Sequence, residues 1–255
     1  MDTNPIVPST KRVRAYFAGT KVADTVSARL VWENPHYPAY YLPREDVRSE
    51  ILAPTSHTER HARGLARFFD VRAGDRIAPR AAWQYADSPI PELRDLVRID
   101  WNAMDAWFEE EEEVYVHPRD PFKRVDILAA SRHVVVSIGG VVLAETRRPT
   151  LVFETGLPMR CYLSKTDVRM DLLTPIDKRT GCAYKGFARY WVYAVDGEVI
   201  EEDVAWSYPH PLPDAAKIAG MLGFYNETLD IDVDGVRLPR PITEFSRDTR
   251  RVVEA

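Results

Sequence analysis

The chain has 255 residues, of which 45% are hydrophobic, and a formal net charge of −5 at pH 7. This length and composition can bury two hydrophobic cores of ordinary size, which excludes a disordered or fibrous protein. The arginines are dispersed among acids, so the sequence lacks the clustered Lys and Arg that nucleic-acid binding requires, and we predict no nucleic-acid partner.

Membrane insertion and secretion are not expected either. No stretch approaches the roughly 18 apolar residues of a membrane span, and residues 1–5 show neither the basic nor the apolar part of a signal peptide. We therefore expect a cytoplasmic protein that does not enter a membrane. Its two cysteines, Cys161 and Cys182, are too few for a disulfide framework or a four-ligand structural zinc site, and no cofactor is predicted.

The sequence contains a tandem duplication. Residues 23–48 align without a gap on residues 144–169, and with small shifts the match resumes at 64–67 over 186–189 and at 82–85 over 205–208. A repeat of roughly a hundred residues is too long for a solenoid unit, so each copy should be a domain with its own core. We predict the following division: a first repeat (10–108), a connector (109–131), a second repeat (132–240) and a C-terminal tail (241–255).

In chain order, each repeat opens with a hairpin, over residues 12–24 and again over residues 133–145, where Gly139-Gly140 marks the turn. A short helix is expected after Ser164, because residues 164–167 resemble a capping box, and its twin should begin near Pro43.

A second hairpin is predicted in the second repeat. There, residues 187–195 and 199–208 are rich in β-forming residues and flank Asp196-Gly197, a type I′ turn signal. On strand spacing, Cys161 and Tyr162 should point to opposite faces of a sheet.

The connector starts with an acidic run, residues 109–113, that would repel itself in a core, and continues as a proline-punctuated segment. Its chargeable residues could dock between the two domains, and we take His117, Arg119 and Asp120 as candidate interdomain residues. The alternative is a plain linker held by a salt bridge.

Several spaced motifs of the second repeat resemble a known family. The runs Cys182-Ala183-Tyr184-Lys185-Gly186, Ala205-Trp206-Ser207-Tyr208 and Phe224-Tyr225-Asn226-Glu227 look like the family catalogued as domain of unknown function 427. The whole chain resembles a bacterial subfamily in which this domain occurs twice.

The resemblance implies a β-tent, two antiparallel sheets that meet at an angle. We therefore expect a mainly β protein with two tandem β-tent-like domains and short helices. A nucleotidyltransferase label is also attached to the family. Two departures bear on the site: Cys182-Ala183 stands where the family usually has Cys-Pro, and the first repeat is shorter there, so we interpret the first repeat as a degenerate copy.

Comparing the two copies separates scaffold from candidate site. Positions that keep their type in both copies are assigned to folding. The differences fall on Arg160 (Ala39 in the first repeat), Cys182 (His61) and the Tyr184-Lys185 pair, which faces Arg63 and a deletion. If one copy carries the activity, the reactive groups should lie in the second repeat.

The residue types suggest a chemistry. An ammonium at Lys185 would favour the thiolate of Cys182, so these two are the candidate catalytic residues. Arg160 would help Lys185 to hold an anionic group. Further ligand-binding or acid and base roles are open to Glu154, Tyr162, Tyr184, Trp206 and Tyr208. The alternative for each is ordinary: a buried cysteine, solvated cations and core aromatic rings.

Metal sites are not predicted. Residues 230–235 begin like a calcium loop, but the twelfth position is Pro241, and alternating apolar residues favour a strand that runs into an Asp-Gly turn. His57, Glu59 and His61 are in the wrong order for a zinc-protease helix, and we expect a loop there. A nucleotidyltransferase would need clustered carboxylates for magnesium, and Asp230, Asp232 and Asp234 are the cluster offered.

The sequence therefore supports three functional hypotheses. The first is a site in the second repeat for a small anionic or carbonyl-bearing metabolite, with turnover left open. The second is a non-catalytic binding or assembly module with an interdomain surface, and its protein partners are unknown. The third is a nucleotidyltransferase, which rests on the family label alone.

Overall fold

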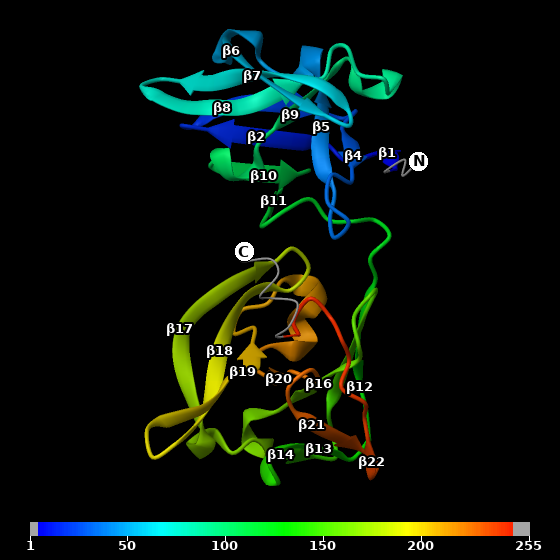
Figure 1. The fold of residues 1–255 in the computed structure, drawn as a ribbon, viewed down its shortest axis with the longest axis vertical. Helices are drawn as coiled ribbons and strands as arrows, with labels where there is room; N and C mark the ends of the chain where they lie inside the picture. The colour runs from blue at the N-terminus through cyan, green and yellow to red at the C-terminus, as the bar shows by residue number, and fades with distance from the viewer. Residues whose placement is uncertain (1–4, 247–255) are drawn as a thin grey trace. The chain divides into compact units, whose positions relative to one another are not determined.

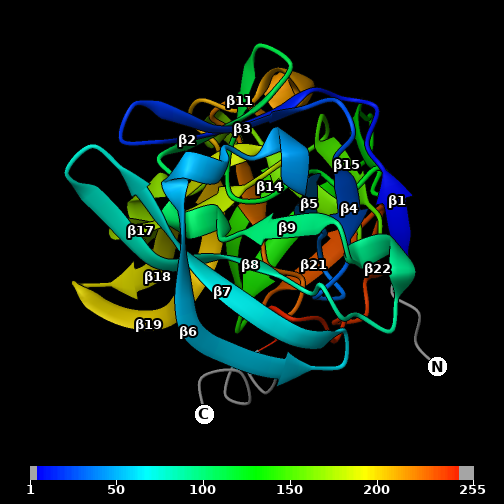
Figure 2. The same ribbon diagram turned by 90° about the horizontal axis from the view of Figure 1, so that it is seen from above.

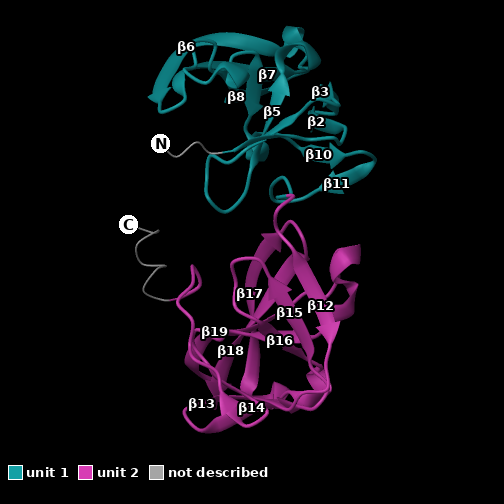
Figure 3. Cartoon of the chain, turned by 90° about the vertical axis from the view of Figure 1, so that its right-hand side faces the viewer, with its two compact units in different colours: residues 1–120 teal, residues 121–255 magenta. Residues whose placement is uncertain are grey.

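The computed structural model describes residues 5–246, except the side chain of Asp203. The chain divides into two compact units, Met1–Asp120 (unit 1) and Pro121–Ala255 (unit 2), shown in two colours in Figure 3. The division falls inside the predicted connector. Residues 1–4, used to predict the absence of a signal peptide, and residues 247–255 of the predicted tail lie outside the described residues.

Unit 1 consists of two antiparallel sheets with short 3-10 helices between strands (Figure 1). Its long sheet has the strand order β1 (Ile6–Pro8), β4 (Arg29–Val31), β5 (Ala39–Pro43), β9 (Leu96–Ile99), β8 (Arg76–Gln84), β7 (Gly64–Ala73) and β6 (Leu52–His61). The short sheet has the order β11 (Glu112–Val114), β10 (Ala106–Glu109), β2 (Val13–Phe17) and β3 (Thr20–Thr25). The 3-10 helices are η1 (Arg44–Asp46), η2 (Ser49–Ile51), η3 (Pro91–Leu93) and η4 (Trp101–Ala103). Figure 2 shows β9, β8, β7 and β6 side by side.

Unit 2 repeats this topology. Its long sheet has the order β12 (Val125–Ala129), β15 (Thr150–Glu154), β16 (Arg160–Leu163), β20 (Leu222–Phe224), β19 (Glu198–Ser207), β18 (Gly186–Val195) and β17 (Leu173–Cys182). The short sheet has the order β14 (Val141–Thr146), β13 (Val134–Ile138), β21 (Asp230–Val233) and β22 (Val236–Arg237). The 3-10 helices are η5 (Lys165–Asp167), η6 (Met170–Leu172) and η7 (Pro213–Ile218). The predicted mainly β, two-domain fold is confirmed.

The predicted hairpins are present in both units. In unit 2, β13 pairs with β14 and β18 pairs with β19. The β18–β19 turn places Asp196 and Gly197 at φ values of 50° and 84°, the positive pair that a type I′ turn requires. Asp230–Val233 is a strand that runs into the Asp234-Gly235 turn, as predicted.

The predicted short helices are present as the 3-10 helices η5, which Ser164 caps by accepting from the Thr166 N–H, and η1, which begins after Pro43. In unit 2 the helix ends after three residues, because Val168 is extended and bridges Ala144 on β14. One local prediction differs from the structure. The expected loop at His57, Glu59 and His61 is wrong, since these residues lie on β6, where Glu59 and His61 pair with Ala66 and Gly64 of β7. Their polar side chains suit an exposed strand.

The predicted connector contributes strands to both units. Its acidic run forms the β10–β11 hairpin, where basic residues of unit 1 compensate the acids: Lys11 Nζ lies 2.5 Å from Glu109, and Arg14 Nη2 lies 3.0 Å from Glu111. Its last part, β12, is the edge strand of the long sheet of unit 2.

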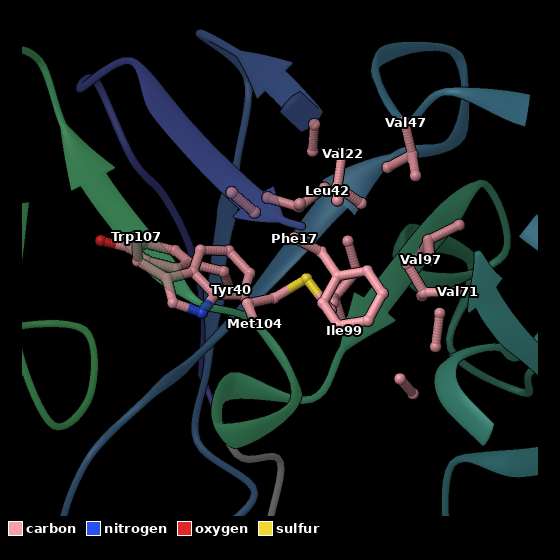
Figure 4. Packing of buried hydrophobic residues seen from close by; sticks show 14 of the residues in the cluster. Phe17, Val22, Tyr40, Leu42, Val47, Val71, Val97, Ile99, Met104 and Trp107 are labelled. Carbon is pink, nitrogen blue, oxygen red and sulfur yellow. The ribbon is translucent and has the colours of Figure 1, made fainter. Parts of the chain in front are cut away.

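Each unit has an inner core between its two sheets and a second apolar cluster on the outer face of its long sheet. Figure 4 shows the inner core of unit 1, with Phe17, Tyr40 and Met104 among its labelled side chains. In unit 2, Cys161 belongs to the inner core, whereas Tyr162 belongs to the outer cluster, which confirms that these neighbours point to opposite faces. Among the described residues, no helix is long and apolar enough to cross a membrane.

Candidate functional site

The outer face of the long sheet of unit 2 brings most of the predicted site residues together. Strand alternation on β16 turns Arg160 and Tyr162 to this face, and on β19 it turns Trp206 there. Glu154 ends β15, and the β17–β18 turn supplies Lys185. Tyr208 and the half-buried Cys182 pack in the same outer cluster.

A buried ion pair lies at this face. Lys185 Nζ donates to Glu154 Oε2, and the two side chains are only 10% and 9% exposed. Burial strips water from both charges, so each depends on the other for compensation. The charge of the Lys185 ammonium is therefore already balanced before any ligand or thiolate approaches it.

Arg160 makes a second ion pair, with Glu227. Its Nη1 and Nη2 donate to the two carboxylate oxygens at 2.6 and 2.7 Å, and the side chains are 6% and 2% exposed. The guanidinium also lies over the rings of Trp206 and Phe245, at 5.6 and 5.9 Å from their centroids. Burial opposes ionisation of Glu227, but the hydrogen bonds from Arg160 and Thr243 outweigh it and lower the pKa of this carboxyl group.

The segment that follows β22 covers this second pair. Thr243 Oγ1 donates to Glu227 Oε1 at 2.5 Å, and Phe245 packs on Tyr225 with ring centroids 6.3 Å apart. These contacts come from the described part of the predicted tail. They hold the guanidinium between aromatic rings and leave it little room to bind an external anion.

The tyrosines form the centre of the cluster. Trp206 Nε1 donates to the Tyr162 hydroxyl at 2.7 Å. Burial raises the pKa of Tyr162, and the nearby Glu154 and Cys182 raise it further. Burial also raises the pKa of Tyr208 well above its ordinary value, with Tyr162 and Cys182 next in effect. These phenols therefore stay protonated at neutral pH and can donate hydrogen bonds.

The remaining predicted residues are Tyr184, which shares the β17–β18 turn with Lys185, and the three interdomain candidates. Tyr184 is half-buried in the turn between Cys182 and Gly186. The three candidate interdomain residues all lie in unit 1. There, Asp120 accepts a hydrogen bond from Trp32 Nε1 at 3.1 Å, His117 stacks on Tyr37 with centroids 4.3 Å apart, and Arg119 is close enough to affect the pKa of Tyr40.

Unit 1 carries a matching cluster that the sequence interpretation missed. Glu33 accepts hydrogen bonds from Tyr41 OH at 2.6 Å and from Arg98 Nε at 3.2 Å, and the Arg98 guanidinium lies over Trp83. Burial raises the pKa of Tyr85, and Glu33 raises it further. Glu33, Tyr41, Trp83 and Tyr85 align with Glu154, Tyr162, Trp206 and Tyr208, and this retained set was the signal available in the sequence.

The acidic motifs are engaged by arginines. Asp230 and Asp232 each lie 2.9 Å from Arg237, and Asp234 lies 2.7 Å from Arg132. In the part of the chain that the structure describes, no group of three or more His, Cys, Asp or Glu residues is arranged to hold a metal ion.

A comparison with protein families shows to which family the chain belongs. The family described as a domain of unknown function (DUF427) matches residues 5–110 and again residues 126–235. The chain belongs to this family. The two matched regions correspond to the two β units, as the tandem duplication predicts. A search of curated proteins found no match.

Proposed function

We propose that unit 2 binds a small metabolite with a carbonyl or carboxylate group at its outer-face cluster, with Lys185 and Cys182 next to the reacting end of the ligand. The observation that carries this proposal is the buried Lys185–Glu154 ion pair beside a half-buried thiol and two protonated tyrosines.

A purely structural role explains this cluster poorly. A buried ion pair costs desolvation free energy, and well-packed apolar residues of similar volume serve folding equally well or better. Both units nevertheless keep a paired glutamate at the same position, and the cation comes from different segments, Arg98 on β9 and Lys185 in the β17–β18 turn. The raised pKa values of Tyr162 and Tyr208 also support a functional role, because perturbed ionisable groups that gather in one place are typical of functional sites.

Each residue has a distinct role in this proposal. Lys185 has three N–H donors and uses one on Glu154, so two can hold a ligand oxygen. Tyr162 and Tyr208 supply hydroxyl groups beside it. In turnover, the Cys182 sulfur would bond to the carbonyl carbon as the carbonyl π bond opens, and the thiol proton would pass to the carbonyl oxygen. Arg160, saturated by Glu227, would support the site rather than hold the ligand.

A thermal-shift and alkylation experiment tests the proposal. The probes are pyruvate, acetoacetate, succinate and inorganic phosphate, and the variants are Lys185→Met and, as a matched control, Lys165→Met. Lys165 is exposed, and its ammonium lies near the ring of Trp191. Trp191 belongs to the inner core and not to the outer-face cluster. We expect at least one organic probe to stabilise unit 2 and to slow iodoacetamide alkylation of Cys182 in wild type and the control but not in Lys185→Met. Equal responses in all three proteins would refute the proposal.

The other two hypotheses have less support. An interdomain role for His117, Arg119 and Asp120 stays an alternative proposal; inside unit 1, His117 stacks on Tyr37 and Asp120 accepts a hydrogen bond from Trp32. The nucleotidyltransferase hypothesis still rests on the family label, since the carboxylates it would use are paired with Arg237 and Arg132.

A further inference from the structure

A cavity of about 110 Å³ opens in unit 1, and Arg98, which pairs with Glu33, is among its lining residues. Aromatic side chains from four segments line it: Tyr37 just before β5 and Tyr40 on it, Trp101 on η4, Trp107 on β10 and His117 after β11. Figure 4 shows Tyr40 and Trp107 together at this end of the inner core, where their ring centroids are 5.7 Å apart.

The rings around the cavity pack face to face. Tyr37 and His117 have centroids 4.3 Å apart with an interplanar angle of 13°, and Trp101 and Trp107 have centroids 5.1 Å apart with an angle of 6°. Such parallel pairs present flat walls, and a flat ring can extend a stack with little loss of conformational entropy.

A strained turn positions the His117 ring, which forms one of these walls. Val116 has φ = +75°, and the His117 N–H donates to the Tyr115 carbonyl at 2.9 Å, which closes a tight γ-turn. A β-branched residue at positive φ is disfavoured, and strained backbone of this kind gathers at ligand sites. The turn carries His117 onto Tyr37 and so completes the cavity.

The polar lining favours a neutral ligand. Arg98 and Asp100 are its two oppositely charged residues; Arg98 pairs with Glu33, and Asp100 accepts the Asn102 backbone N–H at 3.2 Å. The Asn102 amide is exposed and makes no side-chain hydrogen bond to the described residues. An amide presents one donor edge and one acceptor edge in a single plane, which matches a ring with adjacent carbonyl and N–H groups.

We propose that this cavity is a binding site for a neutral planar heterocycle with adjacent carbonyl and N–H groups, stacked on the aromatic walls and read by Asn102. The site is independent of the proposed function of unit 2, because every lining residue belongs to unit 1.

NMR titration of the full-length protein tests this site through the indole N–H signals of Trp101 and Trp107 and the Asn102 side-chain amide. The probes are uracil and nicotinamide, with cyclohexanecarboxamide as a non-planar amide and tetramethylammonium as a cation. The variants are Asn102→Ala and Tyr37→Ala, both at exposed positions, and the control is Glu92→Ala on η3, also exposed and outside the cavity.

We expect uracil or nicotinamide to shift these signals saturably, and each cavity variant to weaken the affinity about tenfold or more, as expected for one lost stacking or paired hydrogen-bond contact. The Glu92→Ala control should bind as wild type does. The proposal is overturned by the absence of saturable shifts, by equal binding of cyclohexanecarboxamide, by a response to tetramethylammonium alone, or by undiminished binding in both cavity variants.

Discussion

Replacing Glu154 by Gln tests whether the Lys185–Glu154 pair is a compensated buried charge. The change keeps the shape of the side chain and one hydrogen-bond acceptor, but it leaves the Lys185 ammonium, 10% exposed, without its anion. Breaking a fully buried pair costs about 3–5 kcal/mol. Since the amide oxygen still accepts from Lys185 and some solvent reaches the pair, we expect a loss of about 2–3 kcal/mol in the free energy of unfolding of unit 2.

Unit 1 supplies the matched control. Glu33 and Arg98 occupy the equivalent place, but they are 25% and 14% exposed, and their closest atoms lie 3.2 Å apart. Water screens this pair more, so Glu33→Gln should cost about 1 kcal/mol or less in unit 1. The double variant Glu154→Leu with Lys185→Met removes both charges and should recover most of the stability that the single change loses.

Native-state amide hydrogen exchange is the suitable assay, because it reports a free energy of opening for each strand and so separates the two units. Slowly exchanging amides of β16 and β19 report unit 2, and those of β5 and β8 report unit 1. A smaller loss for Glu154→Gln than for Glu33→Gln, or a double variant as unstable as the single one, would refute the reasoning.

Three further predictions follow from single positions. A Cβ on Gly223 would lie 2.9 Å from ring atoms of Trp206 and 3.0 Å from Tyr162, so Gly223→Ala should destabilise unit 2 by about 1–3 kcal/mol in denaturant titrations; no loss would mean that the rings move freely. Burial raises the pKa of Cys161 from 9.0 to about 11, so the stability that its neutral thiol contributes is complete below pH 9 and lost as the pH rises through 11. Between these pH values the free energy of unfolding of the wild type should fall by about 2–3 kcal/mol more than that of Cys161→Ala. Parallel plots of unfolding free energy against pH for the two proteins would contradict this. At Val116, where φ is +75°, Gly relieves backbone strain and Ala does not, so Val116→Gly should be more stable than Val116→Ala by about 1 kcal/mol in unit 1. Equal stability of the two variants in denaturant titrations would contradict this.

The sequence predicted the strands and turns that local signals encode. Alternating apolar residues on either side of Asp196-Gly197 determine β18 and β19, and the same alternation separates Cys161 from Tyr162. Such signals reach only a few residues along the chain. They do not require any knowledge of which sheet a strand will join.

Features that depend on distant partners were not predicted. The acidic run after Trp107 can form a hairpin because Lys11 and Arg14, nearly a hundred residues earlier, lie beside its carboxylates. The partners of Arg160 and Lys185 were missed for the same reason. Each was interpreted as a free cation, whereas the fold provides a buried glutamate for both.

The two units neutralise the equivalent glutamate with cations from different positions. Arg98 pairs in register with Tyr41, and Gly223 holds the equivalent place opposite Tyr162. In unit 1, a guanidinium from this position neutralises the glutamate and covers the tryptophan. In unit 2, the missing side chain lets Trp206 and Tyr162 approach each other, and the cation must come from the β17–β18 turn.

What both units retain is therefore a neutralised glutamate among tyrosines, and not a particular cation. An arginine fixed on a strand at that glutamate is a rigid, permanently charged partner that serves packing well. A lysine in a turn has a single nitrogen, and the N–H groups that do not bind the glutamate can bind another acceptor. The strand before this turn ends at Cys182, which aligns with His61 of unit 1. The exchange thus places an ammonium and a thiol at one edge of the cluster in unit 2, which is the arrangement that the proposed carbonyl ligand would use.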